Sequence, residues 1–588
     1  MNRIIHAFFL LFLNLSFVGI GPRAIAQEDS EYERLKQRYP KEEVVISNKR
    51  IEVHIFLEDE GPMAELKEYE RKVYMADNNS YNNREEVYFS AKVMLDEIEG
   101  FTYIPDGNGF DKESITEPEF NDDLDGSSFI DDDRVASFFF PGIAHRARTE
   151  LHTSFTISDP HFIGKNLIAS GYPIDRYELV FDVEEGIDMT FRFFNIDDIE
   201  LKRDSIVKRK KTIYSFTADS LVGLPVEGSS PGLMHYAPHI VYTIASFEMD
   251  GKRLPLLGNL DDLHNWYCGF YREVDLSPSE EMQTIIDSIG RIKTDDLGRL
   301  QSIYEWVQQN IKYISITEGY SGFKSEDAQV TCSNRYGDCK AMSSLIVSMA
   351  TALGIPVYPT WVGTRTLPYS YNNLPTPQTD NHMIATYFHE GKPIFLDGTY
   401  SLLPFGYSPP FIQGKQVLVS KNCESYELME VPVENASRNG IHEKLQVQIN
   451  TEEMRLEGSG VLKAWGLRKM QLTEGLMNAR DEMQWARAVS LKGDNNYRLL
   501  NYSIKGQENV NDSLEIHYSF ELEDYLVELD GQIFINPYLE RIFKGEKISD
   551  NRELPYELDF KQEYTLDITF LKRDDFEFLA FPDDTQLK

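Results

Sequence analysis

The chain has 588 residues, which is more than one hydrophobic core usually spans, so we expect several domains. Its 96 acidic and 59 basic residues give a net charge of −37. Such acidity disfavours nucleic acid and anionic lipid as partners, because phosphate binding requires clustered lysine and arginine side chains. We therefore expect no nucleic-acid partner.

The first 26 residues have the pattern of an export signal. Arg3 precedes an apolar run from Ile4 to Ile20, and Ala24-Ile25-Ala26 forms a small-residue cleavage pattern before Gln27. A membrane anchor is the less favoured alternative, because the run is short. No later segment approaches the roughly 18 to 20 apolar residues that span a bilayer. We therefore expect a mature chain without a transmembrane segment, located in the periplasm, with secretion or the cell surface as alternatives.

Residues 27–275 are predicted to form an N-terminal antiparallel β-sandwich. Alternating apolar residues are typical of half-buried strands, and they occur at Ile51, Val53, Ile55 and Leu57. The segments Tyr177 to Val183 and Ile187 to Phe193 alternate in the same way. Because only Glu184-Glu185-Gly186 separates these two segments, the pattern predicts a hairpin.

The period changes to that of helices after about residue 275. Ser277-Pro278-Ser279-Glu280 has the form of a capping box with proline at the first helical position. Thr294, followed by Asp295 and Asp296, opens a second predicted helix. Its apolar stripe is expected to serve packing, and consists of Leu297, Leu300, Tyr304, Val307 and Ile311.

Cys339 is predicted to be the first residue of a third helix, with Asp338 as its cap and with Gly354 and Pro356 at its end. Unpaired backbone N–H groups in a first turn favour negative charge, and therefore the nucleophilic thiolate. The same groups can stabilise an oxyanion, with Cys339 supplying one donor. The sequence identifies no second donor. Gly337 allows close approach of a substrate or of the turn itself.

His382 and Asp397 lie on two predicted strands joined by a turn around Glu390-Gly391. If these two residues form the turn, Asp397 faces Ile384, so His382 and Asp397 become diagonal neighbours on one face. A two-residue loop at 389 and 390 would place them directly opposite, whereas an odd-numbered loop would separate them. The spacing is compatible with a carboxylate that orients an imidazole. Taken singly, the residues also fit a buried thiol, a core histidine and a turn aspartate.

Several local motifs resemble the transglutaminase-like superfamily of papain-type thiol enzymes. They are Arg335 to Lys340, Gly354-Ile355, Asn381-His382, Leu396 to Thr399 and Gly414 to Val419. The resemblance implies an α+β core at 276–429 with a catalytic triad of Cys339, His382 and Asp397, which forms a thioester with an amide substrate. In related bacterial proteins an acid commonly follows Gly-Asp-Cys-Lys, whereas Ala341 stands here. More loosely, residues 158–179 and the Trp266 region resemble a bacterial β-domain of unknown function that often precedes such a core.

Alternation returns after residue 430 with Leu445, Val447 and Ile449. A helical stretch from about Ala464 to Leu491 interrupts it, and strand-like segments run from Leu514 to Phe576. We therefore expect residues 430–588 to form a C-terminal β-rich domain. The predicted fold class is multidomain α+β, in which the transglutaminase-like core lies between the β-sandwich and this domain.

The four cysteines are too few for a disulfide framework, although a bridge between Cys268 and Cys423, or one that includes Cys332, stays open. A zinc set of Cys332, Cys339, His382 and Asp397 is disfavoured, because it contains no close pair of ligands. Residues 121–132 loosely follow the spacing of a calcium loop through Asn121, Asp123, Asp125, Gly126, Ser127 and Asp132, but a solvated acidic loop is favoured. We expect no metal and no cofactor.

The loop from Thr364 to Thr379 has a length typical of functional or mobile loops. Trp361 and the segment Tyr369 to Tyr371 could line a substrate cleft, but an exposed aromatic loop or a core tryptophan explains them equally well.

The leading hypothesis is an exported cysteine acyl-transfer enzyme of the peptidase or amidase type. Its substrate would be a protein, a peptide or a peptidoglycan-like amide, and hydrolysis is slightly favoured over amine transfer. The alternative is a noncatalytic cell-envelope scaffold, in which the flanking β-domains bind a polysaccharide or a protein. The sequence leaves the oligomeric state open.

Overall fold

A computed structural model describes residues 22–76, 83–107, 109–123, 128–130, 132–493, 496–539, 548–572 and 576–580. It divides into two compact units, one of residues 1–125, 131–226 and 237–258, the other of residues 126–130, 227–236 and 259–588. Helix α1 (Pro22–Arg38) comes first, so residues 1–21 of the expected export segment lie outside the described part. No helix in the described ranges combines the length and apolarity needed to cross a membrane.

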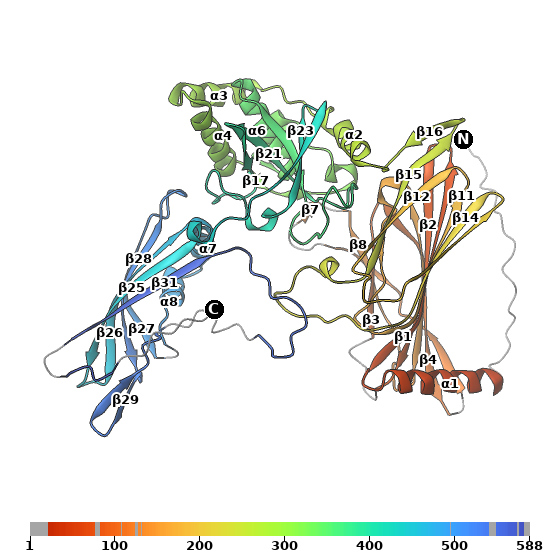
Figure 1. The fold of residues 1–588 in the computed structure, drawn as a ribbon, viewed down its shortest axis with the longest axis horizontal. Coiled ribbons are helices and arrows are strands. Elements are labelled where there is room, and N and C mark those ends of the chain that lie inside the picture. The colour runs from red at the N-terminus through yellow and green to blue at the C-terminus, as the bar shows by residue number, and fades with distance from the viewer. Residues whose placement is uncertain are drawn as a thin grey trace. The chain divides into compact units, whose positions relative to one another are not determined.

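The first unit contains an eight-stranded sheet (Figure 1), in the order β13-β14-β11-β1-β2-β9-β4-β5. These strands are β1 (Val44–Glu58), β2 (Gly61–Tyr74), β4 (Val93–Asp106), β5 (Gly109–Ser114), β9 (Arg148–Ile157), β11 (Ile174–Glu184), β13 (Lys202–Lys208) and β14 (Lys211–Leu221). β1 and β11 run parallel, whereas the other neighbours are antiparallel. The expected antiparallel sandwich therefore contains one parallel pair.

A second sheet of the first unit has the order β10-β15-β12, with β16 added beside β15. Its strands are β10 (Lys165–Leu167), β12 (Ile187–Phe194), β15 (His239–Met249) and β16 (Lys252–Pro255). Inward-facing side chains of both sheets, among them Ile55, Phe181 and Ile244, form one buried core. Burial of this apolar surface holds the sandwich together. A smaller sheet, β3-β8-β6, comprises β3 (Arg84–Phe89), β6 (Glu119–Asp122) and β8 (Arg134–Phe139).

The predicted hairpin around Glu184-Glu185-Gly186 is wrong. β11 pairs with β1 and β14 in the eight-stranded sheet, whereas β12 pairs with β15 in the other sheet. Gly186, at φ +95°, lets the chain turn from one sheet to the other. Phe181 and Phe191 then meet between the sheets, with ring centroids 4.9 Å apart. Alternation fits both arrangements, because each strand buries one face in either case.

The second unit begins with a helical region and a five-stranded antiparallel sheet in the order β22-β21-β20-β23-β24. The helices are α2 (Leu260–Tyr271), α3 (Glu280–Ile292), α4 (Asp296–Asn310), α5 (Ala328–Asn334) and α6 (Cys339–Ala352). The strands are β20 (Val357–Val362), β21 (His382–His389), β22 (Lys392–Leu396), β23 (Gln416–Lys421) and β24 (Ser425–Glu430). α6 lies against the sheet (Figure 1), where Leu345 and Ile346 share a buried cluster with Ala385 and Leu396.

Helix starts in this region differ slightly from the predicted ones. Ser279, rather than Ser277, caps α3, so Pro278 precedes the cap instead of occupying the first helical position. Asp295, rather than Thr294, caps α4. The apolar stripe of α4 is confirmed, because Leu300, Tyr304 and Val307 are buried in the core. Side-chain capping depends on which oxygen reaches the free N–H groups, and neighbouring Ser, Thr and Asp residues compete for that role.

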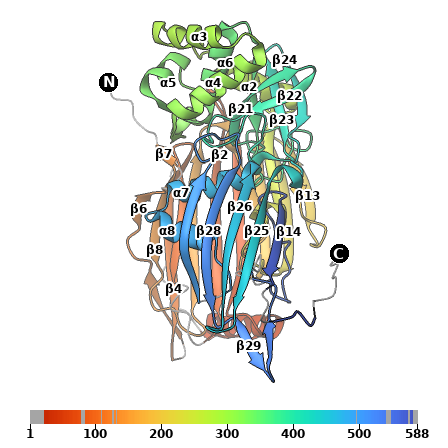
Figure 2. The same cartoon turned by 90° about the vertical axis from the view of Figure 1, so that its left-hand side faces the viewer.

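The rest of the second unit includes a five-stranded sheet in the order β27-β28-β26-β25-β31, whose long strands lie side by side in Figure 2. The strands are β25 (Gly440–Asn450), β26 (Arg455–Trp465), β27 (Tyr497–Lys505), β28 (Leu514–Glu523) and β31 (Glu563–Leu571). The predicted helical stretch is present as two helices, α7 (Gly466–Met477) and α8 (Glu482–Val489). Two-stranded pairs complete the described strands: β17 (Lys312–Tyr313) with β19 (Tyr336–Gly337), β18 (Ser315–Ile316) with β7 (Ser128–Ile130), and β29 (Leu526–Leu529) with β30 (Gln532–Ile535).

The multidomain α+β class is thus confirmed. α2 belongs to the second compact unit, although it precedes the expected boundary at residue 275. The division of the chain at residues 275 and 429 stays a prediction.

The aromatic residues of the 364–379 region belong to the core. Tyr369, Tyr371 and Trp361 are all buried, so the cleft and the exposed-loop interpretations of these rings are wrong. The calcium-like segment begins inside strand β6, which contains Asn121, whereas its residues 125–127 lie outside the described part of the chain.

Candidate active site

Cys339 is the first residue of α6, as predicted. The Asp338 side chain accepts a hydrogen bond from the Ala341 N–H at 2.9 Å, which caps the helix, and it also binds the buried Lys340 ammonium. Asp338 therefore holds the start of the helix through both carboxylate oxygens. Cys339 is buried, with 9% of the residue exposed.

Gly337 is required by the turn itself. A Cβ atom there would lie 2.8 Å from the Ala341 Cβ and 3.1 Å from the Thr331 Cγ2. Because real Cβ atoms do not approach so closely, only glycine lets β19 run directly into α6. Of the two roles considered for Gly337, the structure supports close approach within the turn. Ala341, where related proteins commonly have an acid, is buried in this contact.

His382 and Asp397 adopt the predicted register. His389 pairs with Lys392 and Ala385 with Leu396, so the turn consists of Glu390 and Gly391, both at positive φ. The His382 Nε2 atom lies 2.7 Å from Asp397 Oδ2. Both side chains are buried, with 8% and 1% of their surface exposed. The two side chains thus form a hydrogen-bonded pair shielded from water.

The carboxylate of Asp397 is held on its other side by Thr399. The Thr399 N–H and hydroxyl donate to Asp397 Oδ1 at 3.0 and 2.6 Å. The Tyr304 hydroxyl donates to the Asp397 carbonyl oxygen at 3.1 Å. Tyr304 belongs to the α4 stripe to which only packing was assigned, so this residue also fixes the backbone of the site. These bonds leave Asp397 little freedom to rotate away from His382.

Cys339 and His382 are brought together by the contact between α6 and β21. The Ser343 hydroxyl, one turn after Cys339, donates to the carbonyl of Met383, which follows His382, at 2.9 Å. Since Asp397 occupies Nε2 of His382, Nδ1 is the ring nitrogen left for the Cys339 thiol. An interaction with Cys339 is among those that raise the pKa of His382. The structure therefore brings all three predicted site residues together.

The electrostatics of the pair favour a charged histidine. Burial alone would lower the pKa of His382, but the negative charge of Asp397, the hydrogen bond to Asp397 and the interaction with Cys339 raise it to about 10. Burial would raise the pKa of Asp397, but the His382 charge and the bonds from His382 and Thr399 lower it below its ordinary value. Each group therefore stabilises the ionised form of the other.

Two aromatic residues near the trio were missed by sequence reasoning. The Phe411 ring meets the His382 ring edge-on, with centroids 5.2 Å apart. Tyr313 pairs with Gly337 through β17 and β19, and its side chain is 40% exposed. Partial burial, followed by the charge of Cys339, raises the pKa of Tyr313 above its ordinary value. The signal that could have found Tyr313 is its position just after the α4 stripe, but one exposed aromatic residue is a weak signal.

The structure contains one of the disulfide pairings that the sequence left open. Cys268 and Cys423 form a disulfide, whereas Cys332 and Cys339 are free thiols. Burial raises the pKa of Cys332, although the neighbouring Arg335 guanidinium opposes the shift. Among the described residues no three His, Cys, Asp or Glu side chains are arranged to hold a metal ion.

Comparison with known proteins agrees with this geometry. Residues 283–392, which include Cys339 and His382, match the profile of the transglutaminase-like superfamily. A crystal structure from Parabacteroides distasonis, described as a "putative protease", matches with a TM-score of 0.52 and 12% identity, over 84% of this chain and 94% of that one. At this identity the similarity concerns the fold alone.

A second structure, a "putative cysteine protease" from Cytophaga hutchinsonii, matches 40% of this chain and 73% of its own, with 17% identity and a TM-score of 0.16. No curated protein matches the chain. The family profile, the fold similarity and the motifs around Cys339 and His382 agree with one another. Residues 283–392 of this chain therefore form a transglutaminase-like domain.

Proposed function

We propose that the chain is an exported cysteine hydrolase that cleaves an amide or peptide bond through a thioester at Cys339. The observation that carries this proposal is the position of His382, buried between the Asp397 carboxylate and the Cys339 thiol. A buried imidazole that is oriented by a carboxylate and faces a thiol at a helix start is the arrangement that cysteine acyl transfer requires.

The first half of the reaction would form the thioester. His382 takes the proton of the Cys339 thiol, and the sulfur attacks the amide carbonyl carbon. The Cys339 N–H, in the first turn of α6, can donate to the oxygen that becomes negative. The carbon–nitrogen bond then breaks, and the imidazolium of His382 gives its proton to the leaving amine. Asp397 stabilises the imidazolium throughout.

The second half would release the acid. His382 takes a proton from a water molecule, the hydroxide attacks the thioester, and the carbon–sulfur bond breaks. The proton on His382 returns to the sulfur, so that the thiol is restored. A second amine could replace water in the same step. We favour water, because no feature in the described part of the chain indicates an amine-binding site.

A protein, a peptide or a peptidoglycan-like amide is the proposed substrate class. The proposed location is the periplasm, because the pattern of residues 1–26 is that of an export signal. An amide in the cell envelope would be within reach of an enzyme in that compartment.

The test is covalent labelling by a thiol-reactive acyl probe, followed by mass spectrometry of the labelled peptide. We expect label at Cys339 in the wild type and in Cys332→Ala, and loss of this label in Cys339→Ala. Cys332→Ala is the matched control, since it removes the other free thiol. Equal labelling of the wild type and Cys339→Ala would contradict the proposal. Normal cellular function of a folded Cys339→Ser variant would instead favour the noncatalytic envelope protein.

A further inference from the structure

A second, partly buried carboxyl group, Asp380, lies two residues before His382 and has no part in the proposed chemistry. The Tyr267 hydroxyl donates to Asp380 Oδ2 at 2.7 Å. The Tyr371 hydroxyl donates to the same oxygen, also at 2.7 Å. Both tyrosines are buried. Two buried hydroxyls that converge on one carboxylate oxygen indicate a site that is fixed in position rather than a solvated side chain.

The residue between Asp380 and His382 is fixed as well. The Asn381 Oδ1 atom accepts a hydrogen bond from the Thr364 N–H at 2.9 Å, and Asn381 Nδ2 donates to the Thr364 hydroxyl at 3.1 Å. The chain is therefore held at two consecutive residues before His382, which is the first residue of β21. The position of the imidazole depends on where this segment enters the sheet.

Tyr267 also reaches the site through aromatic packing. Its ring stacks on Trp361 of β20 with centroids 4.9 Å apart and an interplanar angle of 14°. Trp361 pairs with Met383, and Val362 pairs with His382. The tyrosine therefore contacts both the segment before His382 and the strand beside it.

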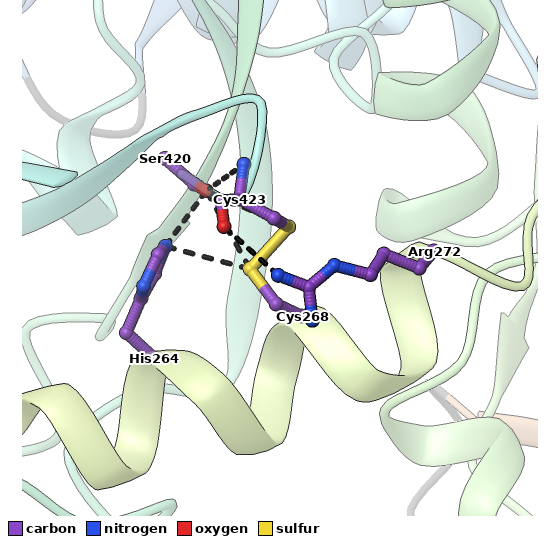
Figure 3. The surroundings of a disulfide bond; sticks show 5 residues. All are labelled: His264, Cys268, Arg272, Ser420 and Cys423. Carbon is purple, nitrogen blue, oxygen red and sulfur yellow. Dashed lines mark hydrogen bonds between the residues drawn. A yellow bond between two sulfur atoms is a disulfide. The ribbon is translucent and has the colours of Figure 1, made fainter. Parts of the chain in front are cut away.

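Helix α2, which carries Tyr267, is anchored to the same sheet by a disulfide (Figure 3). Cys268 joins Cys423, in the turn after β23, across a Cα–Cα distance of 5.6 Å. One turn earlier on α2, the His264 Nε2 atom lies 2.8 Å from the Ser420 hydroxyl, and one turn later Arg272 donates to the Cys423 carbonyl oxygen at 2.9 Å. Three successive turns of the helix are thus attached to one end of β23.

We propose that Asp380 is a positioning residue for His382, and that α2, anchored by its disulfide, holds Asp380 in place through Tyr267 while Tyr371 holds it from the preceding loop. This inference rests on the proposed function, in which His382 is the base. Its physical reason is geometric, because a misplacement of about 1 Å at a catalytic group can cost on the order of 100-fold in rate.

The charges around Asp380 fit a role in positioning. Burial raises the pKa of Asp380 to about 7, although the hydrogen bonds from Tyr371 and Tyr267 lower it. The titratable groups that face it are Tyr267 from α2 and Tyr371 from the loop, while β20 contributes the uncharged Trp361. Burial and the Asp380 charge raise the pKa of both tyrosines well above the ordinary value, so both remain donors at neutral pH.

The experiment compares Tyr267→Phe, Tyr371→Phe and the double variant in the full chain, with a peptide amide that the wild type cleaves. We expect kcat to fall about 5-fold for each single variant, as for the loss of one hydrogen bond of about 1 kcal/mol. The double variant should lose roughly 20-fold or more, with KM within about twofold of the wild type. The matched control is Tyr271→Phe, because Tyr271 is on the same helix and also contacts Trp361.

A second readout does not depend on turnover. In chains labelled with ¹⁵N-histidine, the His382 ring signals, assigned with His382→Gln, should broaden or shift in the double variant but not in Tyr271→Phe. Unchanged His382 signals and kcat in the double variant would overturn the positioning role, even if Cys339 is catalytic. Changed His382 signals in the double variant, together with a wild type that shows no Cys339 chemistry, would support positioning and count against the proposed function. The two proposals can therefore fail separately.

Discussion

Two aspartates, the buried Asp397 and the partly buried Asp380, flank His382, and they differ in what surrounds them. Asp397 faces the imidazole at 2.7 Å, and the positive charge there lowers its pKa. Asp380 faces two neutral hydroxyls, and burial raises its pKa to about 7. At Asp397 the nearby His382 cation compensates for the loss of hydration on burial. At Asp380 the two neutral hydroxyl donors do not offset that loss. In the proposed mechanism Asp397 would support the charge of His382 during catalysis, whereas Asp380 would support its position.

The largest expected effect comes from Asp397→Asn, which preserves shape but removes the charge. We expect kcat to fall by on the order of 10³-fold or more, because His382 loses the partner that orients it and stabilises its imidazolium. The pKa of His382 should fall from about 10, since the charge that opposes burial is gone. Kinetics and a ¹⁵N-histidine titration by NMR measure both changes. A variant within tenfold of wild-type kcat would contradict the role of Asp397.

The same pair should make stability depend on pH. Because the pKa of His382 is raised, its contribution is fully present below its ordinary value of 6.5 and is lost as pH rises through about 10. Because the pKa of Asp397 is lowered, its contribution is present above its ordinary value of 3.8 and is lost as pH falls through the folded-state value. Between these limits the free energy of unfolding of Asp397→Asn, measured by urea denaturation, should be about 3–5 kcal/mol lower than that of the wild type. A pH-independent difference would argue against the ion pair.

Removal of the disulfide between Cys268 and Cys423 should have the next largest effect, on the free energy of unfolding. It closes a loop with a sequence separation of 155, so Cys268→Ser combined with Cys423→Ser should cost about 2–5 kcal/mol of unfolding free energy. Denaturant unfolding under oxidising conditions measures this cost, and Cys332→Ser is the control for removal of a buried sulfur atom. If the double variant were as stable as the control, α2 would not depend on the covalent anchor.

Asp380→Asn should change the pH dependence of stability in the opposite direction to Asp397→Asn. The pKa of Asp380 is raised from 3.8 to about 7, so wild-type stability should decline as pH rises through this window and then level off. The slope expected from this group is about 1.4 kcal/mol per pH unit at most. The asparagine variant should lack this pH dependence. The free energy of unfolding of the wild type minus that of the variant should therefore fall as pH rises from about 4 to 7. If this difference in unfolding free energy rose with pH instead, Asp380 would have a positively charged partner.

Tyr313→Phe should have the smallest effect. The ring beside Gly337 would remain, while the hydroxyl near the Cys339 charge would be lost. We expect kcat to fall by a few-fold, about 1 kcal/mol in barrier height, if this hydroxyl contacts the reacting carbonyl. Tyr336→Phe, an exposed neighbour in the same small sheet, is the control. Equal kinetics for the two variants would remove Tyr313 from the site.

The helix start at Cys339 and the register of His382 and Asp397 could be predicted from the sequence because their constraints are local. The cap at Asp338 and the two-residue turn at Glu390 and Gly391 each follow from a few neighbouring residues, and together they determine where Cys339, His382 and Asp397 point. The apolar stripe of α4 and the ends of α6 were predicted from the same kind of short-range pattern.

The failures involve pairing between distant segments. Alternation in β11 and β12 cannot reveal that the chain passes between sheets at Gly186. Four cysteines leave several pairings open, and the one that forms joins residues 155 positions apart. Asp380 gave no signal, because its importance comes from Tyr267, which lies 113 positions earlier in the chain.

In the proposed mechanism, His382 activates Cys339. The most direct measurement is the rate at which iodoacetamide modifies Cys339 at pH 6.5, resolved by mass spectrometry in the wild type and in His382→Ala. Cys332 serves as the internal standard for folding, because it is a buried thiol in both proteins. We expect His382→Ala to slow modification of Cys339 by about tenfold or more and to leave modification of Cys332 unchanged. Equal rates at Cys339 in the two proteins would contradict it.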